Sequence, residues 1–436
     1  MTHPATPPAS PVRDLYDLVT GDEDARVCRD ISDDACREQP ANFFVHLPAL
    51  FANKAGDLLA SPKLTLPWLL RSLGAPPWML GWLVPLREAL ALLPQLAVAG
   101  WMRRVSVRKW FWVAGAATQG LAAAGMAWTA WSLEGVAAGA TLLALLALLS
   151  LGRGVASVAY KDVLGKTIAK TRRGTLSGYA ASGAGGFALL LSALVLLWPG
   201  LSDAPDMLAG LLAMAGLLWL IAAAVFAGLR EVPGATGGGG NALTEAWANL
   251  RLVRDHPAFA RFILVRGLLV STALGAPFYV DLARQSGGTL TSFAVFLAVS
   301  GLADLLGAPW WGRASDRSAR RVLIATGLLA ALVHLAVAAM GLFQTPTLLL
   351  AAAFFALMWL HAGVRLARKT YLVDLADAEH RAAYTAVSNT LIGVLLLVGG
   401  GLASLAALLG TPAALTLLAL LAIAGSLLAI RLPEVQ

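Results

Sequence analysis

Apolar runs of about 20 residues recur along almost the whole chain, and a run of that length is what an α-helix needs to cross a bilayer. Strands of a membrane barrel would instead alternate polar and apolar residues. The sequence therefore predicts an all-α integral membrane protein with twelve transmembrane helices. The predicted spans are residues 42–62, 77–100, 110–132, 135–158, 175–198, 206–229, 259–282, 290–311, 321–343, 347–366, 382–407 and 412–431.

The basic residues are concentrated in alternate loops. Five loops are rich in Lys and Arg, near residues 101–109, 159–174, 230–261, 312–321 and 365–381. The loops near 133, 199–205, 344–346 and 408–411 contain none, and those near 63–75 and 283–289 hold only Lys63, Arg71 and Arg284. Basic loops favour the cytoplasmic side, and an even number of spans places both termini there as well.

Composition supports this class. Of the 436 residues, 58% are hydrophobic and 13% are charged, whereas a soluble domain carries about 25% charged residues. The net charge of +8 is spread over five short loops, so we expect no nucleic-acid partner. We expect a monomeric, multi-pass protein of the cytoplasmic (inner) membrane, surrounded by the lipid bilayer.

Two polar segments divide the chain. Residues 1–41 form an acidic segment, which we predict to be cytoplasmic. Residues 230–258 contain a glycine run followed by a helix-like stretch, and we interpret them as a cytoplasmic linker with a surface helix. Six-helix bundles are therefore predicted at 42–229 and 259–431, with a cytoplasmic tail at 432–436.

Both cysteines, Cys28 and Cys36, lie in the acidic segment. They lack the C-x-x-C spacing of zinc and redox motifs. We expect reduced thiols on a cytoplasmic helix and neither a metal site nor a disulfide.

Corresponding loops of the two predicted bundles resemble each other. The stretch "GWMRRVSVRK" from Gly100 and the stretch "GRASDRSARR" from Gly312 share a glycine and a closing basic pair, at an offset of 212 residues. A similar offset of 208 residues relates "RGTLSGY" from Arg173 to "RAAYTAV" from Arg381. These repeats predict two pseudo-symmetric halves, an architecture found in transporters.

The second of these loops resembles the signature G-x-L-x-D-R-x-G-R-[KR] of the major facilitator superfamily, as do the span count and the linker. The matching residues are Gly312, Asp316, Arg317, Arg320 and Arg321 in the second half and Gly100, Arg108 and Lys109 in the first. The first copy has Arg104 where the family has an aspartate.

The resemblance implies that these loops latch the cytoplasmic ends of neighbouring helices in an outward-facing state. It places Asp316 near the start of the eleventh span, where a helix N-terminus favours negative charge. Arg381, just before that span, is the expected partner of Asp316. The alternative is that these are ordinary positive-inside residues.

The fifth predicted span carries small residues at every fourth position, at Gly174, Gly178, Ser182 and Gly186. Such a face lets helix backbones approach closely. We interpret it as a packing surface.

Charged residues inside the spans are the candidates for solute binding and coupling, because a charge at mid-bilayer normally faces a cavity or a partner. The candidates are Asn53, Lys54, Asp57, Arg87, Glu88, Arg153, Arg266, Asp304 and His361. Lys54 with Asp57 and Arg87 with Glu88 are alternatively structural pairs. Arg365 and Arg368 are alternatively interfacial residues that only reach toward the cytoplasm.

We interpret the protein as a secondary transporter that moves a small organic solute by alternating access, without a cofactor and with the proton gradient as its energy source. Asp57 and Glu88 are the predicted proton-responsive groups, and the excess of bases indicates an anionic or zwitterionic solute. An uncoupled facilitator and a non-transporting sensor or scaffold remain alternatives. The six scattered histidines form no nucleophile–base set or metal cluster, so no enzyme is predicted.

Overall fold

The regular structure of the computed structural model is helical throughout the residues that it describes, which are 11–20, 31–197, 204–236, 251–343, 345–376 and 381–435. The first half contains α1 (Pro11–Thr20), α2 (Asp33–Leu59), α3 (Thr65–Ser72), η1 (Pro77–Met79), α4 (Leu80–Leu92), α5 (Gln95–Met102), α6 (Lys109–Ser132), α7 (Gly135–Thr167), α8 (Lys170–Leu197) and α9 (Ala204–Ala227). The second half contains α11 (Arg251–Asp255), α12 (Pro257–Leu268), α13 (Ser271–Leu274), α14 (Ala276–Gln285), α15 (Leu290–Met340), α16 (Thr347–Leu375), α17 (Arg381–Ala407) and α18 (Thr411–Ala429).

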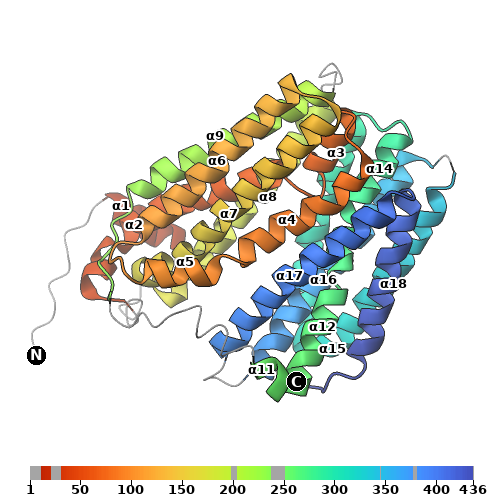
Figure 1. Cartoon of the computed structure of the whole chain (residues 1–436). Coiled ribbons are helices and arrows are strands. Elements are labelled where there is room, and N and C mark those ends of the chain that lie inside the picture. Colours follow the sequence, from red (N-terminus) through yellow and green to blue (C-terminus); the bar gives the residue numbers. More distant parts are fainter. Residues whose placement is uncertain are drawn as a thin grey trace, which may run out of the picture.

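These helices form two bundles that lie at an angle to each other (Figure 1). In the first bundle α6 packs against α7 and α9, and α2 packs against α8 and α9. In the second bundle α15 packs against α16 and α18, and α12 packs against α17 and α18. The predicted fold class is therefore confirmed.

Nine helical segments of the described residues are long and apolar enough to cross a membrane. One of them, α15, has 51 residues, about twice the length that one crossing needs. Its backbone is extended at Ser318, so α15 consists of two helices joined at that residue. We predicted a loop over 312–321, but the chain is helical up to this single break, and the prediction is wrong in its extent.

The first and seventh spans are interrupted helices. The first runs through α2 and α3 with a break at 60–64, and the seventh runs through α12, α13 and α14. The first span thus continues beyond its predicted end at residue 62, and Lys63, predicted in a loop, lies at the break inside the span. Interrupted helices leave backbone polar groups free and are typical of the sites of secondary transporters.

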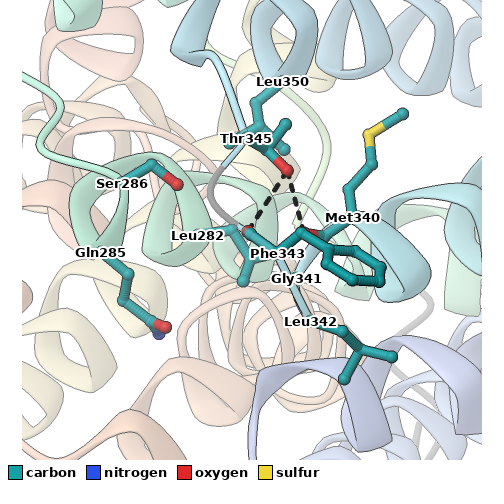
Figure 2. Close-up of a pocket in the computed structure, with 9 residues that line it drawn as sticks. All are labelled: Leu282, Gln285, Ser286, Met340, Gly341, Leu342, Phe343, Thr345 and Leu350. Carbon is teal, nitrogen blue, oxygen red and sulfur yellow. Dashed lines mark hydrogen bonds between the residues drawn. The ribbon is translucent and has the colours of Figure 1, made fainter.

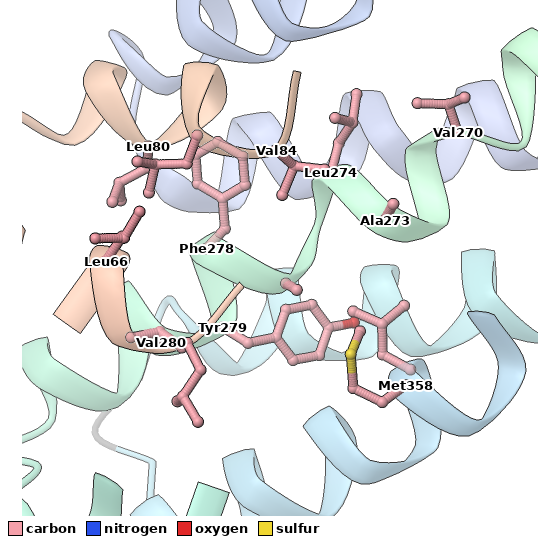
Figure 3. Packing of buried hydrophobic residues seen from close by; sticks show 14 of the residues in the cluster. Leu66, Leu80, Val84, Val270, Ala273, Leu274, Phe278, Tyr279, Val280 and Met358 are labelled. Carbon is pink, nitrogen blue, oxygen red and sulfur yellow. The ribbon is translucent and has the colours of Figure 1, made fainter. Parts of the chain in front are cut away.

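The two halves meet at one end of the molecule, which we call the closed end. There α3 packs against α14, and α4 and η1 pack against α17. Figure 3 shows Phe278 of α14 pointing toward Leu80 and Val84 of α4, with Leu66 of α3 nearby. All four side chains are buried, so an apolar layer seals the closed end.

The opposite end carries the basic loops and is called the basic end. Figure 1 shows α5 and α1 of the first half separated there from α11 of the second half. The contacts that join the halves come mainly from α3, η1 and α4 toward the closed end and from α8, which packs against α15. The structure is therefore closed at one end and splayed at the other.

Helix α1 attaches the N-terminal segment to the first bundle. Tyr16 packs edge-on against Phe43, and its hydroxyl accepts a hydrogen bond of 2.8 Å from Nε2 of Gln39. The hydroxyl of Tyr179 in α8 donates to the carbonyl of Val19 at 3.1 Å. These contacts place α1 across the ends of α2 and α8.

Two smaller predictions are wrong. A Cβ atom added at Gly174, Gly178 or Gly186 would meet no atom within 4 Å, so the small-residue face of α8 is open in this structure and is not a packed surface. Cys36, expected as a reduced thiol, is disulfide-bonded. The other cysteine of the sequence, Cys28, lies outside the described residues.

Candidate functional site

The carboxylate of Asp57 in α2 lies between two arginines. Arg87 of α4 and Arg153 of α7 both donate to Oδ1 of Asp57 and form ion pairs with it. The side chain of Arg87 is 5% exposed and that of Arg153 is 39% exposed. The group thus lies at the inner surface of the first bundle, with one arginine buried and the other open to the space beside it.

This pairing differs from the predicted one. We expected Lys54 to pair with Asp57 and Arg87 to pair with Glu88. In the structure Asp57 is shared by Arg87 and Arg153, and Lys54 acts on it only through its charge. Glu88 is exposed, and no ion pair of Glu88 is present among the described residues.

A cavity of about 230 Å³ opens beside Asp57. Its lining includes Asn53, Lys54, Asp57, Arg153, Ser157 and Tyr160. The hydroxyl of Tyr160 is buried without a hydrogen-bond partner in the described part of the chain. Asn53 accepts a hydrogen bond of 3.1 Å from the indole of Trp219, which holds it against α9. The cavity therefore offers polar groups of both signs to a solute.

Lys63 connects this region to the second half. The charges that act on it are those of Glu88 in the first half and Asp304, Arg365 and Arg368 in the second. Of these groups, Arg365 and Asp304 form an ion pair of 2.9 Å, with side chains 48% and 64% exposed. Charges within membrane spans normally face a cavity or a partner, and Asp304 and Arg365 are partners of each other.

Two further candidates lie in the second half. Nη1 of Arg266 donates to Ser388 at 2.6 Å, and Nη2 donates to Asn389 at 3.2 Å. Nδ1 of His361 is 3.0 Å from the hydroxyl of Thr272 in α13, just after the break that separates α12 from α13. Both Arg266 and His361 are buried, and the charge of Arg368 acts on both.

Of the predicted candidates, the structure brings Asp57, Arg87 and Arg153 together in the first half, and it pairs Asp304 with Arg365 in the second. Sequence reasoning missed Lys63, which it placed in a loop, and it left Arg368 open as an interfacial residue. The repeat offset of 212 relates Lys54 to Arg266. At the same offset Lys63 corresponds to Gly275, so the repeat gave no signal for Lys63.

At the basic end of the first half, one acidic residue joins the ends of three helices. Glu231, which follows α9, accepts hydrogen bonds from the backbone N–H groups of Arg108 and Lys109 and pairs with Lys166 at 3.1 Å. Arg108 and Lys166 also pair with Asp162. Arg108 and Lys109 are predicted latch residues, and here they join the start of α6 to the ends of α7 and α9.

The second half has a similar arrangement. Glu434, which follows α18, accepts a hydrogen bond of 3.0 Å from Ser318 and lies 3.2 Å from Nε of Arg320. The backbone N–H of Arg321 donates to the Ser318 hydroxyl at 3.2 Å. Each half therefore uses a carboxylate after its last span to hold the start of its third span.

The predicted pairing of Asp316 with Arg381 stays a prediction. Asp316 and Arg317 are exposed, and no ion pair of Asp316 is present in the described residues. Its helix, α15, packs against α16, α18 and α8, with no comparable packing against α17. The side chain of Arg381 lies outside what the structure describes, and the latch stays a prediction. Gly100 lies in α5 and Gly312 in α15, and a Cβ atom at Gly312 would meet no atom.

A hollow of about 270 Å³ lies elsewhere, between the end of α14 and the turn that joins α15 to α16 (Figure 2). Its lining is Leu282, Gln285, Ser286, Met340, Gly341, Leu342, Phe343, Thr345 and Leu350. No charged side chain lines it. The hydroxyl of Thr345 donates a hydrogen bond of 2.9 Å to the carbonyl of Met340. The hollow is separate from the charged set.

The described residues contain no group of three or more His, Cys, Asp or Glu side chains that could hold a metal ion. The charges of the site are instead arginines, lysines and isolated carboxylates. Arginines and lysines bind organic anions, and carboxylates can take up a proton.

Comparison with known proteins supports the resemblance found in the sequence. Residues 268–436 match the model of the Major Facilitator Superfamily. Uncharacterized proteins of Mycobacterium tuberculosis and Mycobacterium bovis are 29% identical over 200 residues, which are 45% of this chain and 37% of those proteins. The aligned part thus spans little more than a third of these relatives.

Solved transporters have the same fold over most of the chain. A D-xylose–proton symporter aligns with a TM-score of 0.68 at 13% identity, covering 89% of this chain and 98% of its own. A POT family transporter in complex with a thioalcohol-conjugated peptide aligns with a TM-score of 0.68 at 13% identity, covering 93% of this chain and 98% of its own. A nucleoside transporter aligns with a TM-score of 0.68 at 12% identity, covering 89% of this chain and 99% of its own. The chain has the fold of major facilitator superfamily transporters.

Proposed function

We propose that the protein is a secondary active transporter that moves a small organic solute across the cytoplasmic membrane by alternating access. The observation that carries this proposal is that each half holds paired charges within its spans, Asp57 with Arg87 and Arg153 in the first half and Asp304 with Arg365 in the second. These charges lie between a sealed end and a splayed end. A midplane site that is open to one side at a time is what alternating access requires.

The positive-inside bias identifies the basic end as cytoplasmic. The structure then corresponds to a cytoplasm-open state. Its closed end is held by the apolar layer of Leu66, Leu80, Val84 and Phe278. Transport requires that this layer separates while the basic ends of the halves come together.

We propose proton coupling through Asp57 and Glu88. In the cytoplasm-open state two arginines balance the charge of Asp57, while Glu88 is exposed. A bound anionic group that competes for Arg153 or Arg87 releases Asp57 to take up a proton. Solute binding and protonation are linked in this way, because each changes the free energy of the other.

Proteoliposomes test the coupling. A solute panel is assayed with and without an imposed pH gradient, in the wild type and in Asp57→Asn and Glu88→Gln, which keep shape but do not titrate. At least one variant is expected to lose pH-driven accumulation while retaining counterflow. Asp206→Asn, an exposed position in the first turn of α9, is the matched control.

If both variants accumulate solute as the wild type does, the coupling assignment is wrong. Wild-type protein that equilibrates solute without accumulating it under any gradient is an uncoupled facilitator. A sensor predicts no flux of any solute. It also predicts that deleting residues 1–40 abolishes activity, whereas a transporter keeps its flux.

A further inference from the structure

Gln119 of α6 presents a buried carbonyl oxygen whose hydrogen-bonding capacity is unused. The residue is 1% exposed and lines the cavity beside Asp57. Its Nε2 donates to the carbonyl of Gly115 at 3.3 Å, one turn earlier in the helix. Its Oε1 is buried without a partner in the described part of the chain. A buried acceptor without a donor is unfavourable, and an amide oxygen can only accept, so this part of the cavity lacks a donor.

Lys54 of α2 has the opposite need. It lines the same cavity and is half-buried, and it forms no hydrogen bond or ion pair with the residues that the structure describes. The nearby carboxylate of Asp57 forms its ion pairs with Arg87 and Arg153 instead. An ammonium group has three donors and no acceptor, so Lys54 is complete only when a ligand supplies an acceptor, preferably an anion.

The cavity brings these two needs into one space. Its volume is about 230 Å³, and its lining comes from four helices of the first half, α2, α6, α7 and α8. Pockets for drug-sized ligands have about 300–1,000 Å³, so this one suits a smaller molecule. Trp112 forms an apolar wall of the cavity and is held by stacking on Phe226, with ring centroids 4.0 Å apart. A small molecule that fills the cavity therefore contacts both Lys54 and Gln119.

The fixed charges favour a ligand with a net negative charge. Lys54 and Arg153 line the cavity, and Arg87 adds a third cation through its ion pair with Asp57. Asp57 is the one carboxylate among the lining residues that the structure describes. A carboxylate on the ligand reduces this excess of positive charge, whereas an ammonium group on the same ligand restores it. The donor that Gln119 lacks is therefore best supplied by a neutral hydroxyl group.

Resting on the proposed transport function, we infer that the solute is a small hydroxy acid. Its carboxylate binds to Lys54, and its hydroxyl group donates to Oε1 of Gln119. Arg153 lines the same cavity and is 39% exposed, so a carboxylate bound there also competes with Asp57 for this arginine.

Equilibrium binding to the full chain in lipid nanodiscs tests this inference, with the Kd from calorimetry as the readout. The probes are butyrate, 3-hydroxybutyrate, 4-hydroxybutyrate and the two corresponding aminobutyrates. At least one hydroxybutyrate is expected to bind about threefold to tenfold more tightly than butyrate, which is the effect of one neutral hydrogen bond. The amine analogue of that hydroxybutyrate is expected to bind more weakly than the hydroxy acid.

Gln119→Met keeps the size of the side chain and removes the acceptor. We expect it to lower the affinity for the preferred hydroxybutyrate to that for butyrate and to leave the Kd of butyrate unchanged. Gln95→Met in α5 is the matched control. Nε2 of Gln95 also donates to a carbonyl four residues earlier, that of Ala91, at 2.9 Å, but Gln95 does not line the cavity.

Lys54→Met is expected to weaken binding of butyrate and of the hydroxybutyrates alike, by at least about tenfold, because both lose a charge-assisted hydrogen bond. Lys161→Met, an exposed position of α7, is the control. If Gln119→Met does not fold, the comparison of the hydroxybutyrates with butyrate on the wild type and on Lys54→Met still decides the outcome.

Four results overturn the inference. They are a hydroxyl group that gives no gain over butyrate on the wild type, a gain that persists in Gln119→Met, an amine analogue that binds more tightly than the hydroxy acid, and binding that is unchanged in Lys54→Met. A wild type that binds none of the probes also overturns it.

The two proposals fail in different ways. Flux of another solute in proteoliposomes, without binding of any hydroxy acid, overturns the hydroxy-acid site and leaves the transporter intact. Binding that depends on Lys54 and Gln119, without flux of the bound probe in either direction, supports the site and contradicts transport.

Discussion

At the scale of single residues, the site depends on how each charge is compensated. Asp57 is surrounded by Arg87, Arg153 and, through its charge, Lys54. Removing the carboxylate leaves three cations close together. Removing one partner of a fully buried ion pair destabilises a protein by about 3–5 kcal/mol, and a smaller loss applies here because Arg153 is 39% exposed.

We therefore expect Asp57→Ala to lower the unfolding temperature in nanodiscs clearly more than Asp304→Ala does. Asp304 is the control because both members of its ion pair with Arg365 are exposed, with side chains 64% and 48% exposed. Exposed ion pairs contribute about 0–1 kcal/mol to the free energy of unfolding. If the unfolding temperature falls equally in the two variants, the ion pairs of Asp57 contribute no more to stability than that of Asp304, and the expectation is wrong.

At the scale of helices, carboxylates that follow the last span of each half hold the turn before the third span. Glu231 accepts two backbone N–H bonds at the start of α6, at 2.9 Å and 2.7 Å. Glu434 holds Ser318 and Arg320 at the break of α15. Because a carboxylate has this position in both halves, a substitution of Glu231 and one of Glu434 can serve as controls for each other.

Glu231→Gln is expected to increase amide hydrogen exchange over residues 103–109, because the amide group no longer pairs with Lys166 and accepts the backbone bonds more weakly. Exchange over residues 318–321 is expected to stay unchanged. Glu434→Gln is expected to show the converse pattern. A variant that raises exchange at both places indicates general destabilisation and contradicts a local role.

The open face of α8 leads to a second prediction at this scale. Gly174, Gly178 and Gly186 have free space beside them in this structure, while α8 already packs against α15. Small residues permit closer approach of helices. We expect this face to be covered when the basic ends come together.

Gly178→Trp is then expected to hold the basic end open. Spin labels at Arg103 and Lys369, one in each half, report the distance between the basic ends of the halves. In Gly178→Trp we expect the population with a short distance, in which the basic ends are together, to be lost together with solute flux. The control is Gly210→Trp in α9, where a Cβ also meets no atom within 4 Å. Normal flux and distances in Gly178→Trp mean that this face points to lipid.

At the scale of the whole molecule, the closed end is held by one buried ion pair in addition to its apolar layer. Nε of Arg71 in α3 lies 2.5 Å from Oδ1 of Asp281 in α14, whose side chain is fully buried. Thr411 and Gln285 donate to the other oxygen of Asp281. Arg71 and Asp281 belong to different halves, so the pair has to break when the closed end opens.

Asp281→Asn is expected to shift the population toward the state that is open at this end. Spin labels at Ser72 and Ser286, in a background with both cysteines replaced by serine, measure the distance between α3 and the end of α14. The variant is expected to gain a longer distance and to retain the fold. An unchanged distance distribution means that the apolar layer alone keeps this end closed.

The sequence by itself determined the properties that depend on neighbouring residues. A run of about 20 apolar residues specifies a membrane span whatever the rest of the chain does, and loop charge specifies orientation just as locally. The helical class follows from these signals, whereas the stretches at Gly100 and Gly312, which were predicted as loops, begin inside α5 and α15. The errors occurred where helices are interrupted, as at Lys63, because a break within a span looks like a loop in the sequence.

Only the tertiary structure decided which charges meet. Asp57 pairs with residues 30 and 96 positions away, and Arg71 pairs with Asp281 across the two halves. Neighbours in sequence, such as Arg87 and Glu88, do not pair because adjacent residues of a helix point in different directions. Ion pairing depends on distance in space, and the packing of separate spans sets that distance. The shared carboxylate of Asp57 and the ion pair between Arg71 and Asp281 could therefore be recognised only in the folded chain.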